Sequence, residues 1–581
     1  MKSLYKIVHL LPTNQYPVCF LLLLAMLVGG ILEAVGIGAI LPLISVMGDE
    51  AFLARHDRVN EFAGQIGISS HTEFVLFCAG SLVVIYLLKN LFIGFESWWQ
   101  FRFVVKNQVI YSSNLFAEYL SRPYLFHINH NTAQLLRNVN NGGMVVFSNI
   151  LLPLLSIITE FITAAVIWLM LVFVEPFAAI VVAGIMGGIL LAIIKSFRKR
   201  IAKQGIIQKD YQTKFLKWLN QGLGAIKETK VMHKENHFLQ EFDNAYGFYG
   251  WAMGRFDFLN TLPRLFIETV VVSGLLFLII AKMLMGNSPT DIVPLLGVLA
   301  MAAFRLMPSA NRIVNFYNAI KFNMPFFHEI YPELYAIRQR LAHKELDIMP
   351  NKTKKLPFND HLTIKNLGFH YADGKAVLED VSFTIPKGKF VGIMGQSGAG
   401  KTTFVDILLG LLPPSKGSIL VDGHDIQSDI RGWQENIAYV PQSIYLIDGS
   451  IKENIAMGTP LSDIDETKIT KALKMAELYD VVQDMPGGIN TMVGERGVRL
   501  SGGQRQRIGI ARALYQEPEV LILDEATSAL DNETEKSITE TILRLKGQLT
   551  IIAIAHRVST LDECDFKVKF EEGKATVLGD A

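Results

Sequence analysis

The sequence predicts a membrane protein in two parts: an all-α domain of six transmembrane helices, followed by a soluble α/β domain. Half of the 581 residues are apolar and only 19% are charged, whereas soluble domains carry about 25% charged residues. Apolar runs of the roughly 20 residues needed to cross hydrocarbon lie before residue 320. After residue 345 the chain shows short buried strands alternating with helices, a pattern typical of an α/β fold.

Charge and cysteine content exclude several other classes. The 55 basic and 54 acidic residues leave a net charge of +1, so we expect no nucleic-acid partner and no acidic disordered tail. Three cysteines, Cys19, Cys78 and Cys564, are too few for a disulfide framework or a four-thiolate zinc site. The composition is therefore that of a membrane protein with a soluble part.

Six apolar runs define the expected membrane spans. They cover Tyr16–Val46, Glu73–Phe95, Val145–Val172, Phe177–Ile194, Leu265–Met285 and Ile292–Ile313. The first run is longer than the core of a signal peptide, and no small-residue cleavage site follows it, so we expect it to be retained rather than cleaved.

The connections between the spans predict the orientation in the membrane. Spans three and four, and spans five and six, are joined by a few residues, whereas spans two and three, and four and five, are separated by long helical connections. Basic residues concentrate in these long connections, with Arg198, Lys199 and Arg200 consecutive. Because positive charge stays on the cytoplasmic side, we expect a multi-pass protein of the cell inner membrane with both termini and the soluble domain in the cytoplasm.

One loop on the outer side, residues 48–72, is longer than the others. Val59, Phe62 and Ile66 recur there at helical spacing, which indicates a short amphipathic helix on the membrane surface. An ordinary capped loop is the alternative. A polar segment with Pro350 and Pro357 then predicts the main boundary, with the transmembrane domain at 1–340, a linker at 341–360 and the soluble domain at 361–581.

The soluble domain carries a phosphate-binding loop. An apolar strand, Phe390–Met394, leads into Gly-Gln-Ser-Gly-Ala-Gly-Lys-Thr-Thr at 395–403 and then into a helix. This is the pattern G-x-x-x-x-G-K-[ST] between a strand and a helix, in which backbone N–H groups and the helix N-terminus bind phosphate oxygens. The nucleotide-binding residues that we expect are Gly395, Ser397, Gly398, Gly400, Lys401, Thr402 and Thr403.

A second buried strand, Val520–Leu523, ends in Asp524 and Glu525. Behind a phosphate loop, this pattern predicts that Asp524 and the Thr402 hydroxyl bind Mg²⁺ and that Glu525 polarises the attacking water. The sequence thus predicts a site that binds and splits a nucleoside triphosphate.

The segment Leu500-Ser-Gly-Gly-Gln504 resembles the signature of the ATP-binding cassette (ABC) family. Further residues stand where that family has its landmarks, in the same order. They are Tyr371 for adenine stacking, Gln442 for Mg²⁺ and coupling, residues 494–497 for an exporter-specific loop, Asp531 for the loop at the dimer interface, and His556 for the γ-phosphate.

The resemblance implies a mechanism. Two cassettes bind two ATP molecules with Mg²⁺ between them, each phosphate loop facing Ser501 and Gly503 of the other copy. It implies catalytic roles for Glu525, His556 and Gln442, with Gln442 also a metal ligand. Because the motifs of this chain are intact, we expect an ABC exporter half-transporter that works as a homodimer. In such exporters short cytoplasmic helices rest on the cassettes, and we expect them near Arg122–His127 and Gly224–Lys230.

Four cations in or beside the spans are candidates for the transported substrate: Lys89, Arg264, Arg305 and Arg312. Charge in hydrocarbon is costly and marks function, and a cationic cavity would attract a phosphate or pyrophosphate. The alternative is internal pairing with Glu33, Glu96, Glu160 or Glu268.

Residues 304–313 resemble the sixth span of the bacterial flippases for lipid-linked oligosaccharides, the PglK type, and Lys89 and Arg264 stand in similar contexts. That resemblance implies the flipping of a pyrophosphate-linked polyprenyl oligosaccharide from the inner to the outer leaflet, for protein glycosylation. Lys89 stands where we expect arginine, so its charge is kept but the bidentate fork is lost. The alternatives are an exporter of drugs, peptides or lipid A-like lipids, and a nucleotide-gated channel, which the intact Glu525 and His556 argue against.

Overall fold

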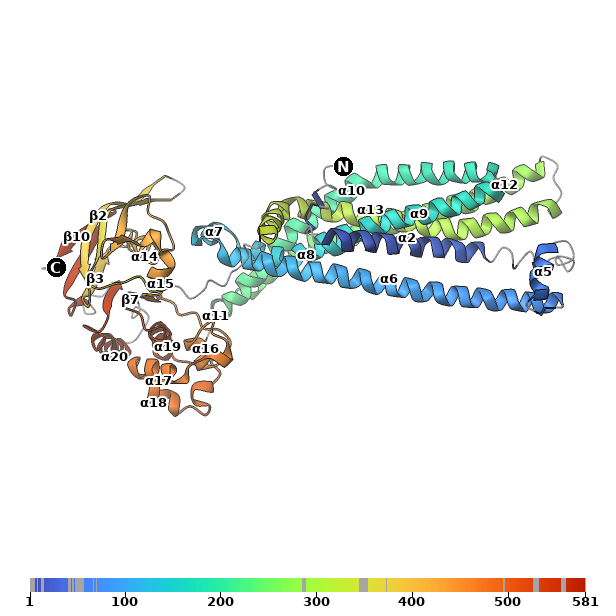
Figure 1. The fold of residues 1–581 in the computed structure, drawn as a ribbon. Coiled ribbons are helices and arrows are strands. Elements are labelled where there is room, and N and C mark those ends of the chain that lie inside the picture. The colour runs from blue at the N-terminus through green and yellow to red at the C-terminus, as the bar shows by residue number, and fades with distance from the viewer. Residues whose placement is uncertain are drawn as a thin grey trace. The chain divides into compact units, whose positions relative to one another are not determined.

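The structure of this chain is a computed structural model (Figure 1). It describes residues 6–7, 9–11, 15–39, 43, 46–47, 57–65, 67–68, 70–174, 176–284, 289–343, 354–371, 374–494, 497–525, 532–554 and 561–579. The chain divides into two compact units, Met1–Arg122 with Asn129–Ile348, and Pro123–Ile128 with Met349–Ala581. A six-residue segment at 123–128 thus belongs to the second unit, and the predicted bounds at 340 and 361 stay predictions.

The first unit is helical. Its helices are α2 (Tyr16–Gly38), α5 (Asp57–Gln65), α6 (His71–Ser121), α8 (Thr132–Val146), α9 (Leu152–Val174), α10 (Pro176–Gly224), α11 (Ile226–Val231), α12 (Glu235–Leu284) and α13 (Pro289–His343). One π-helical turn, Phe147–Leu151, joins α8 to α9. In Figure 1 the long helices α10, α12 and α13 pack along one another, and α9 packs on α2 and α13.

Local sequence sets the ends of these helices. Ser70 and Glu73 form a capping box at the start of α6, each side chain bonding the other residue's backbone N–H. At the other end, Arg122 has extended backbone angles, as expected for a residue before a proline, here Pro123. The short helix α5 falls in the loop for which an amphipathic helix was predicted, and Val59 and Ala63 pack there beside Phe74 of α6. The role of α5 at a membrane surface stays a prediction.

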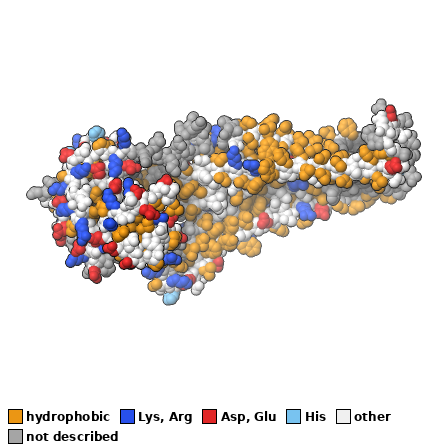
Figure 2. Space-filling view, turned by 60° about the horizontal axis from the view of Figure 1, so that its bottom comes forward, with side chains coloured by type: hydrophobic (Ala, Val, Ile, Leu, Met, Phe, Trp, Pro, Cys, Tyr) orange, Lys and Arg blue, Asp and Glu red, His pale blue; other side chains and the backbone are white. Residues whose placement is uncertain are grey.

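Apolar side chains cover much of the face of the first unit that Figure 2 shows. On α6 and α12, for example, Leu76, Val83, Leu91 and Phe277 are each more than 60% exposed. Exposed apolar area on this scale marks a surface that faces something other than water. Among the described residues, helices 16–33, 71–121 and 132–173 contain segments long and apolar enough to cross a membrane. The count of six spans stays a prediction.

Ion pairs join the polar ends of these helices. Arg137 of α8, whose side chain is 2% exposed, pairs with Glu329 of α13, and Lys209 of α10 reaches the same carboxylate over 2.6 Å. Burial by itself raises the pKa of Glu329, but the hydrogen bond from Lys209 and the charge of Arg137 outweigh it and hold that pKa below its usual value. Three helices that are distant in sequence are thereby tied at one point.

The second unit is an α/β domain with two sheets. Its strands are β1 (His361–His370), β2 (Ala376–Pro386), β3 (Phe390–Gly395), β4 (Lys416–Val421), β5 (His424–Asp425), β6 (Ile437–Val440), β7 (Val520–Asp524), β8 (Thr550–Ile554), β9 (Phe566–Glu571) and β10 (Lys574–Leu578). Its helices are α7 (Tyr124–Asn129), α14 (Lys401–Leu408), α15 (Ile430–Gln434), α16 (Ile451–Ile455), α17 (Glu466–Met475), α18 (Tyr479–Gln483), α19 (Gly502–Tyr515) and α20 (Asn532–Leu543).

The sheet topology places the site. A six-stranded sheet has the order β10-β9-β3-β8-β7-β6, in which β9, β3, β8, β7 and β6 are parallel and β10 is antiparallel. A four-stranded antiparallel sheet has the order β2-β1-β4-β5. Ile393 of β3 and Asp524 of β7 both align with Ile554 of β8. The carboxyl ends of these strands therefore share one edge, where α/β sheets bind ligands.

Short helices lie at both places predicted between the long ones. These are α7 and α11. Leu125 of α7 packs against the apolar core that the two sheets of the second unit share with α14. The contact of this first short helix with the α/β domain is thus the predicted one.

Candidate functional site: a nucleotide-binding edge

The phosphate loop runs from the end of β3 to the start of α14. Gly395, Gly398 and Gly400 have φ values of 151°, 83° and 98°, which favour glycine. At Gly395 a Cβ would lie 2.3 Å from the carbonyl oxygen of Phe570, so no side chain fits there. The loop leads directly into the N-terminus of α14, and backbone N–H groups at a helix N-terminus favour the binding of phosphate.

Lys401 opens α14 and folds back over the loop. Its Nζ donates hydrogen bonds to the carbonyl oxygens of Gly395 and Gln396, over 2.7 and 2.9 Å. Burial lowers the pKa of this ammonium, and the negative charges of Glu525 and Asp524 work in the opposite direction. The amine thus lies at the centre of the loop, near both predicted acids, where it fits a polyphosphate.

Tyr371 lies beside the same helix. Its hydroxyl is 3.3 Å from the Thr403 hydroxyl, and its ring makes an edge contact with Phe369 at 4.9 Å between centroids. The ring is half-buried against the core of the two sheets. It is held near the start of α14, a position compatible with stacking on a base.

Asp524 and Glu525 follow β7 at the shared edge. Glu525 has a φ of 48°, and a positive φ at a residue other than glycine marks strain held by its surroundings, often at a functional site. Its backbone N–H donates to Ile554 over 3.0 Å. Gln442 donates from Nε2 to the Glu525 carboxylate over 2.7 Å. The structure thus brings Gln442 and Glu525 together, two residues to which the sequence assigned related roles.

The acids and Lys401 fit a magnesium–nucleotide group. Burial raises the pKa of Asp524, and the negative charge of Glu525 acts in the same direction. Thr402 and Thr403 follow Lys401 in the first turn of α14. Carboxylates and hydroxyls of this kind are the ligands that Mg²⁺ takes beside phosphates.

The signature segment begins a helix. Ser501 caps α19: its hydroxyl accepts from the N–H of Gln504 over 3.2 Å, and the Gln504 side chain accepts from the N–H of Ser501 over 2.9 Å. This capping box gives hydrogen-bond partners to two backbone N–H groups at the start of the helix. Ser501 is exposed and Gly503 is half-exposed, so both can be reached from another chain.

Two predicted site residues lie outside the described residues: Asp531 and His556. The same holds for Glu495 and Arg496 of the predicted exporter loop.

The four predicted substrate cations have different surroundings. Lys89 is 9% exposed on α6, with its Nζ 4.4 Å from the centroid of the Tyr86 ring. Arg312 instead pairs with Glu160, its Nη2 donating to Oε2 over 3.0 Å. That is the internal pairing which the sequence left open.

Arg264 lies exposed on α12. Arg305 lies on α13, and its side chain falls outside the described residues.

Two residues near the nucleotide-binding edge of the sheet do not belong to any of the family motifs. Asp406 of α14 is half-buried, and burial together with the charge of Asp524 raises its pKa to about 6. Tyr439 of β6 contacts Asp524. The alternation of β6 could have indicated Tyr439, since it places this residue on the face opposite Ala438 and Val440.

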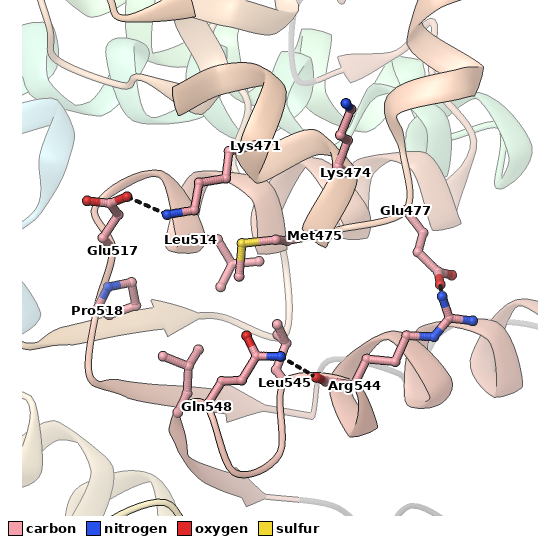
Figure 3. Close-up of a pocket in the computed structure, with 11 residues that line it drawn as sticks. Lys471, Lys474, Met475, Glu477, Leu514, Glu517, Pro518, Arg544, Leu545 and Gln548 are labelled. Carbon is pink, nitrogen blue, oxygen red and sulfur yellow. Dashed lines mark hydrogen bonds and ion pairs between the residues drawn. The ribbon is translucent and has the colours of Figure 1, made fainter. Parts of the chain in front are cut away.

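A separate cavity of about 370 Å³ lies in the same domain (Figure 3). Its floor is apolar, with Met475, Leu514 and Leu545. Its rim carries two ion pairs, Lys471–Glu517 over 2.7 Å and Arg544–Glu477 over 2.6 Å. No predicted nucleotide residue lies in its described lining. The rim charges bind one another, and the lining comes from α17, from the end of α19 and from the turn that follows α20.

Comparison with known proteins agrees with this geometry. Residues 378–528 match the model of the family described as ABC transporter. A bacterial Atm1-family ABC exporter with ATP bound has the same fold, with a TM-score of 0.68 and 23% identity over 94% of this chain and 95% of that one. The chain carries an ABC transporter domain on an ABC exporter fold. This is consistent with ATP hydrolysis coupled to transport, the predicted enzyme class.

Two curated relatives extend the comparison. The heterocyst differentiation ATP-binding protein HepA of Nostoc sp. is 44% identical over 219 residues, which are 38% of this chain and 36% of that protein. The ATP-dependent lipid A-core flippase of Saccharophagus degradans is 33% identical over 410 residues, 69% of this chain and 66% of that protein. Both matches thus span less than two thirds of the relative's length.

Proposed function

We propose that two copies of this chain form an ATP-driven exporter that flips a pyrophosphate-linked polyprenyl oligosaccharide from the inner to the outer leaflet. The observation that supports the ATP-driven step is the shared edge of the six-stranded sheet. This edge brings the glycine loop and Lys401 close to Asp524 and Glu525, which is the arrangement that binding of a nucleoside triphosphate requires. The exposed cap at Ser501 supports the homodimer, because it leaves the signature open to the other copy.

Each nucleotide residue has a defined role in this proposal. The loop from Gly395 to Gly400, with Ser397 and Gly398, holds the phosphates, together with Lys401 and Thr403. Thr402, Asp524 and Gln442 hold Mg²⁺, which offsets phosphate charge when bound. Tyr371 stacks on adenine, while Ser501, Gly503 and Asp531 act across the dimer.

Hydrolysis then depends on three side chains. Glu525 orients the attacking water and accepts its proton, and Gln442 holds the Glu525 carboxylate in place. His556 contacts the γ-phosphate.

The proposed binding of the lipid substrate depends on cations in the first unit. Lys89 lies buried at the level of the second predicted span, and Arg264 is exposed on α12. A pyrophosphate would bind to such cations by charge-assisted hydrogen bonds. Arg305 joins them, whereas Arg312 has Glu160 as a partner and contributes only if that pair opens. The protein would act in the cell inner membrane, with the ABC domain and both termini in the cytoplasm.

A lipid A-like lipid is the second candidate substrate. A relative with 33% identity is named a lipid A-core flippase, and such a lipid shares phosphate and hydrocarbon with the first candidate. Drugs and peptides have no specific support from these residues.

The test is lipid flipping in proteoliposomes that contain the purified protein. One set of vesicles carries a pyrophosphate-linked polyprenyl oligosaccharide and a second set carries lipid A, with Glu525→Gln as the hydrolysis-deficient control. ATP-dependent movement of the oligosaccharide lipid, absent in the control, is the expected result. Movement of lipid A alone would favour the second candidate, and ATP hydrolysis without movement of either lipid would refute both substrates while leaving the ATP chemistry in place.

A further inference from the structure

One polar side chain of β6 contacts the predicted Mg²⁺ ligand. The Tyr439 hydroxyl donates a hydrogen bond to Oδ2 of Asp524 over 3.1 Å. β6 and β7 are parallel neighbours in which Tyr439 aligns with Ile522. Asp524 is two residues further along β7, on the same face, and the length of the tyrosine ring spans that offset.

The Tyr439 ring contributes little to the core. Its neighbours Ala438 and Val440 belong to the apolar cluster under α19, whereas Tyr439 is 37% exposed and points to the other face of the strand. Replacing only the hydroxyl would therefore leave the packing of β6 intact. The hydrogen bond to Asp524 is the interaction that distinguishes tyrosine from phenylalanine at this position.

The same short segment also holds the second acid. Gln442, three residues after Tyr439, donates to Oε2 of Glu525 over 2.7 Å. Residues 439–442 thus fix the orientation of two consecutive carboxylates, one by a hydroxyl and the other by an amide. Burial raises the pKa of Asp524, and the hydrogen bond from Tyr439 opposes that shift because it stabilises the ionised form.

We propose that Tyr439 is a positioning residue for Mg²⁺ binding: its hydroxyl occupies Oδ2 of Asp524 and leaves Oδ1 for the cation. Partners of this kind, one step removed from a metal, fix the orientation of its ligands, and their loss typically weakens metal binding about 10- to 100-fold. The inference rests on the proposed Mg²⁺–ATP chemistry and adds a residue to it.

The experiment compares the full-length wild type with Tyr439→Phe in detergent. The affinity for a fluorescent ATP analogue is measured in EDTA and again in excess Mg²⁺, and the ratio of the two affinities reports Mg²⁺ alone. We expect the affinity in EDTA to be unchanged and the gain from Mg²⁺ to fall about 10-fold. In ATPase assays the KM for the magnesium–ATP complex should rise by a similar factor, with kcat close to that of the wild type.

Tyr445→Phe is the matched control, because Tyr445 is a 62% exposed tyrosine close to the same segment. It should behave as the wild type in each assay. If Tyr439→Phe keeps the full gain from Mg²⁺, or loses affinity equally in EDTA, the positioning role is wrong. A wild type whose nucleotide affinity and hydrolysis are both insensitive to Mg²⁺ would instead overturn the ATP chemistry on which the inference rests.

Discussion

The Glu329 carboxylate is expected to hold the helical unit together, and Glu329→Gln tests this. Glu329 accepts hydrogen bonds from Arg137, from Lys209 over 2.6 Å and from Gln134 over 3.3 Å. The glutamine variant keeps the size of the side chain and removes its charge. It therefore leaves the Arg137 guanidinium, which is 2% exposed, without an opposite charge.

The magnitude follows from burial. Removing one partner of a fully buried ion pair costs about 3–5 kcal/mol. Two facts reduce this figure: Glu329 is 28% exposed, and Arg137 also donates to Thr213 over 2.6 Å and to Asn138 over 2.9 Å. We therefore expect a loss of about 2–3 kcal/mol, which lowers the thermal midpoint by roughly 4–6 °C at about 2 °C per kcal/mol for a large unit.

Scanning fluorimetry of the purified full-length protein at pH 7 measures this midpoint. Because the folded-state pKa of Glu329 lies below its usual 4.5, its stabilisation is present above pH 4.5 and is lost as the pH falls through the folded-state value. The difference between wild type and variant should therefore shrink in acid.

Glu235→Gln is the control, since the Lys230–Glu235 pair is exposed, with side-chain exposures of 65% and 42%. It should give a clearly smaller shift of the midpoint, because an exposed pair contributes little. If Glu329→Gln has as little effect as this control, the argument from the buried ion pair is refuted.

Two further predictions concern the ABC domain. Asp406→Asn should raise the thermal midpoint relative to wild type at pH 8, and by about half as much at pH 5. Burial raises the pKa of Asp406 to about 6 from 3.8. The protonated side chain therefore contributes its full stability below pH 3.8, and this contribution is lost as the pH rises through 6. The difference between these two pKa values corresponds to about 3 kcal/mol at pH 8, reduced to about 1–2 because the group is half-exposed. Equal shifts of the midpoint at both pH values would contradict this. Gly395→Ala should abolish nucleotide binding measured by fluorescence titration, because its Cβ would meet the Phe570 carbonyl at 2.3 Å, and unchanged affinity would show that the loop does not need this close approach.

Much of the nucleotide site could be predicted because its parts are local. The loop at 395–403 combines glycines with positive φ, a lysine and a helix start in nine consecutive residues, and each of these features follows from residue type and position. The capping box at Ser501 and Gln504 is equally local. The apolar runs predicted long helices for the same reason, since helix formation in hydrocarbon depends on a contiguous stretch.

Contacts between distant residues could not be predicted in this way. Arg312 and Glu160 are separated by 152 positions, and their pairing was only one of two alternatives. Tyr439 and Asp524 are 85 positions apart. The positive φ of Glu525 likewise appears only in the folded chain, because a glutamate has no local preference for that conformation.

The sequence by itself determined the chemistry and the two-part architecture of this protein. Motif residues predict which groups bind phosphate and Mg²⁺, and the length and polarity of each run predict whether it prefers lipid or water. Only the tertiary structure decided which charges are paired and which side chains contact Asp524 and Glu525. Pairing depends on how helices and strands far apart in the chain pack, and packing is a property of all their side chains together.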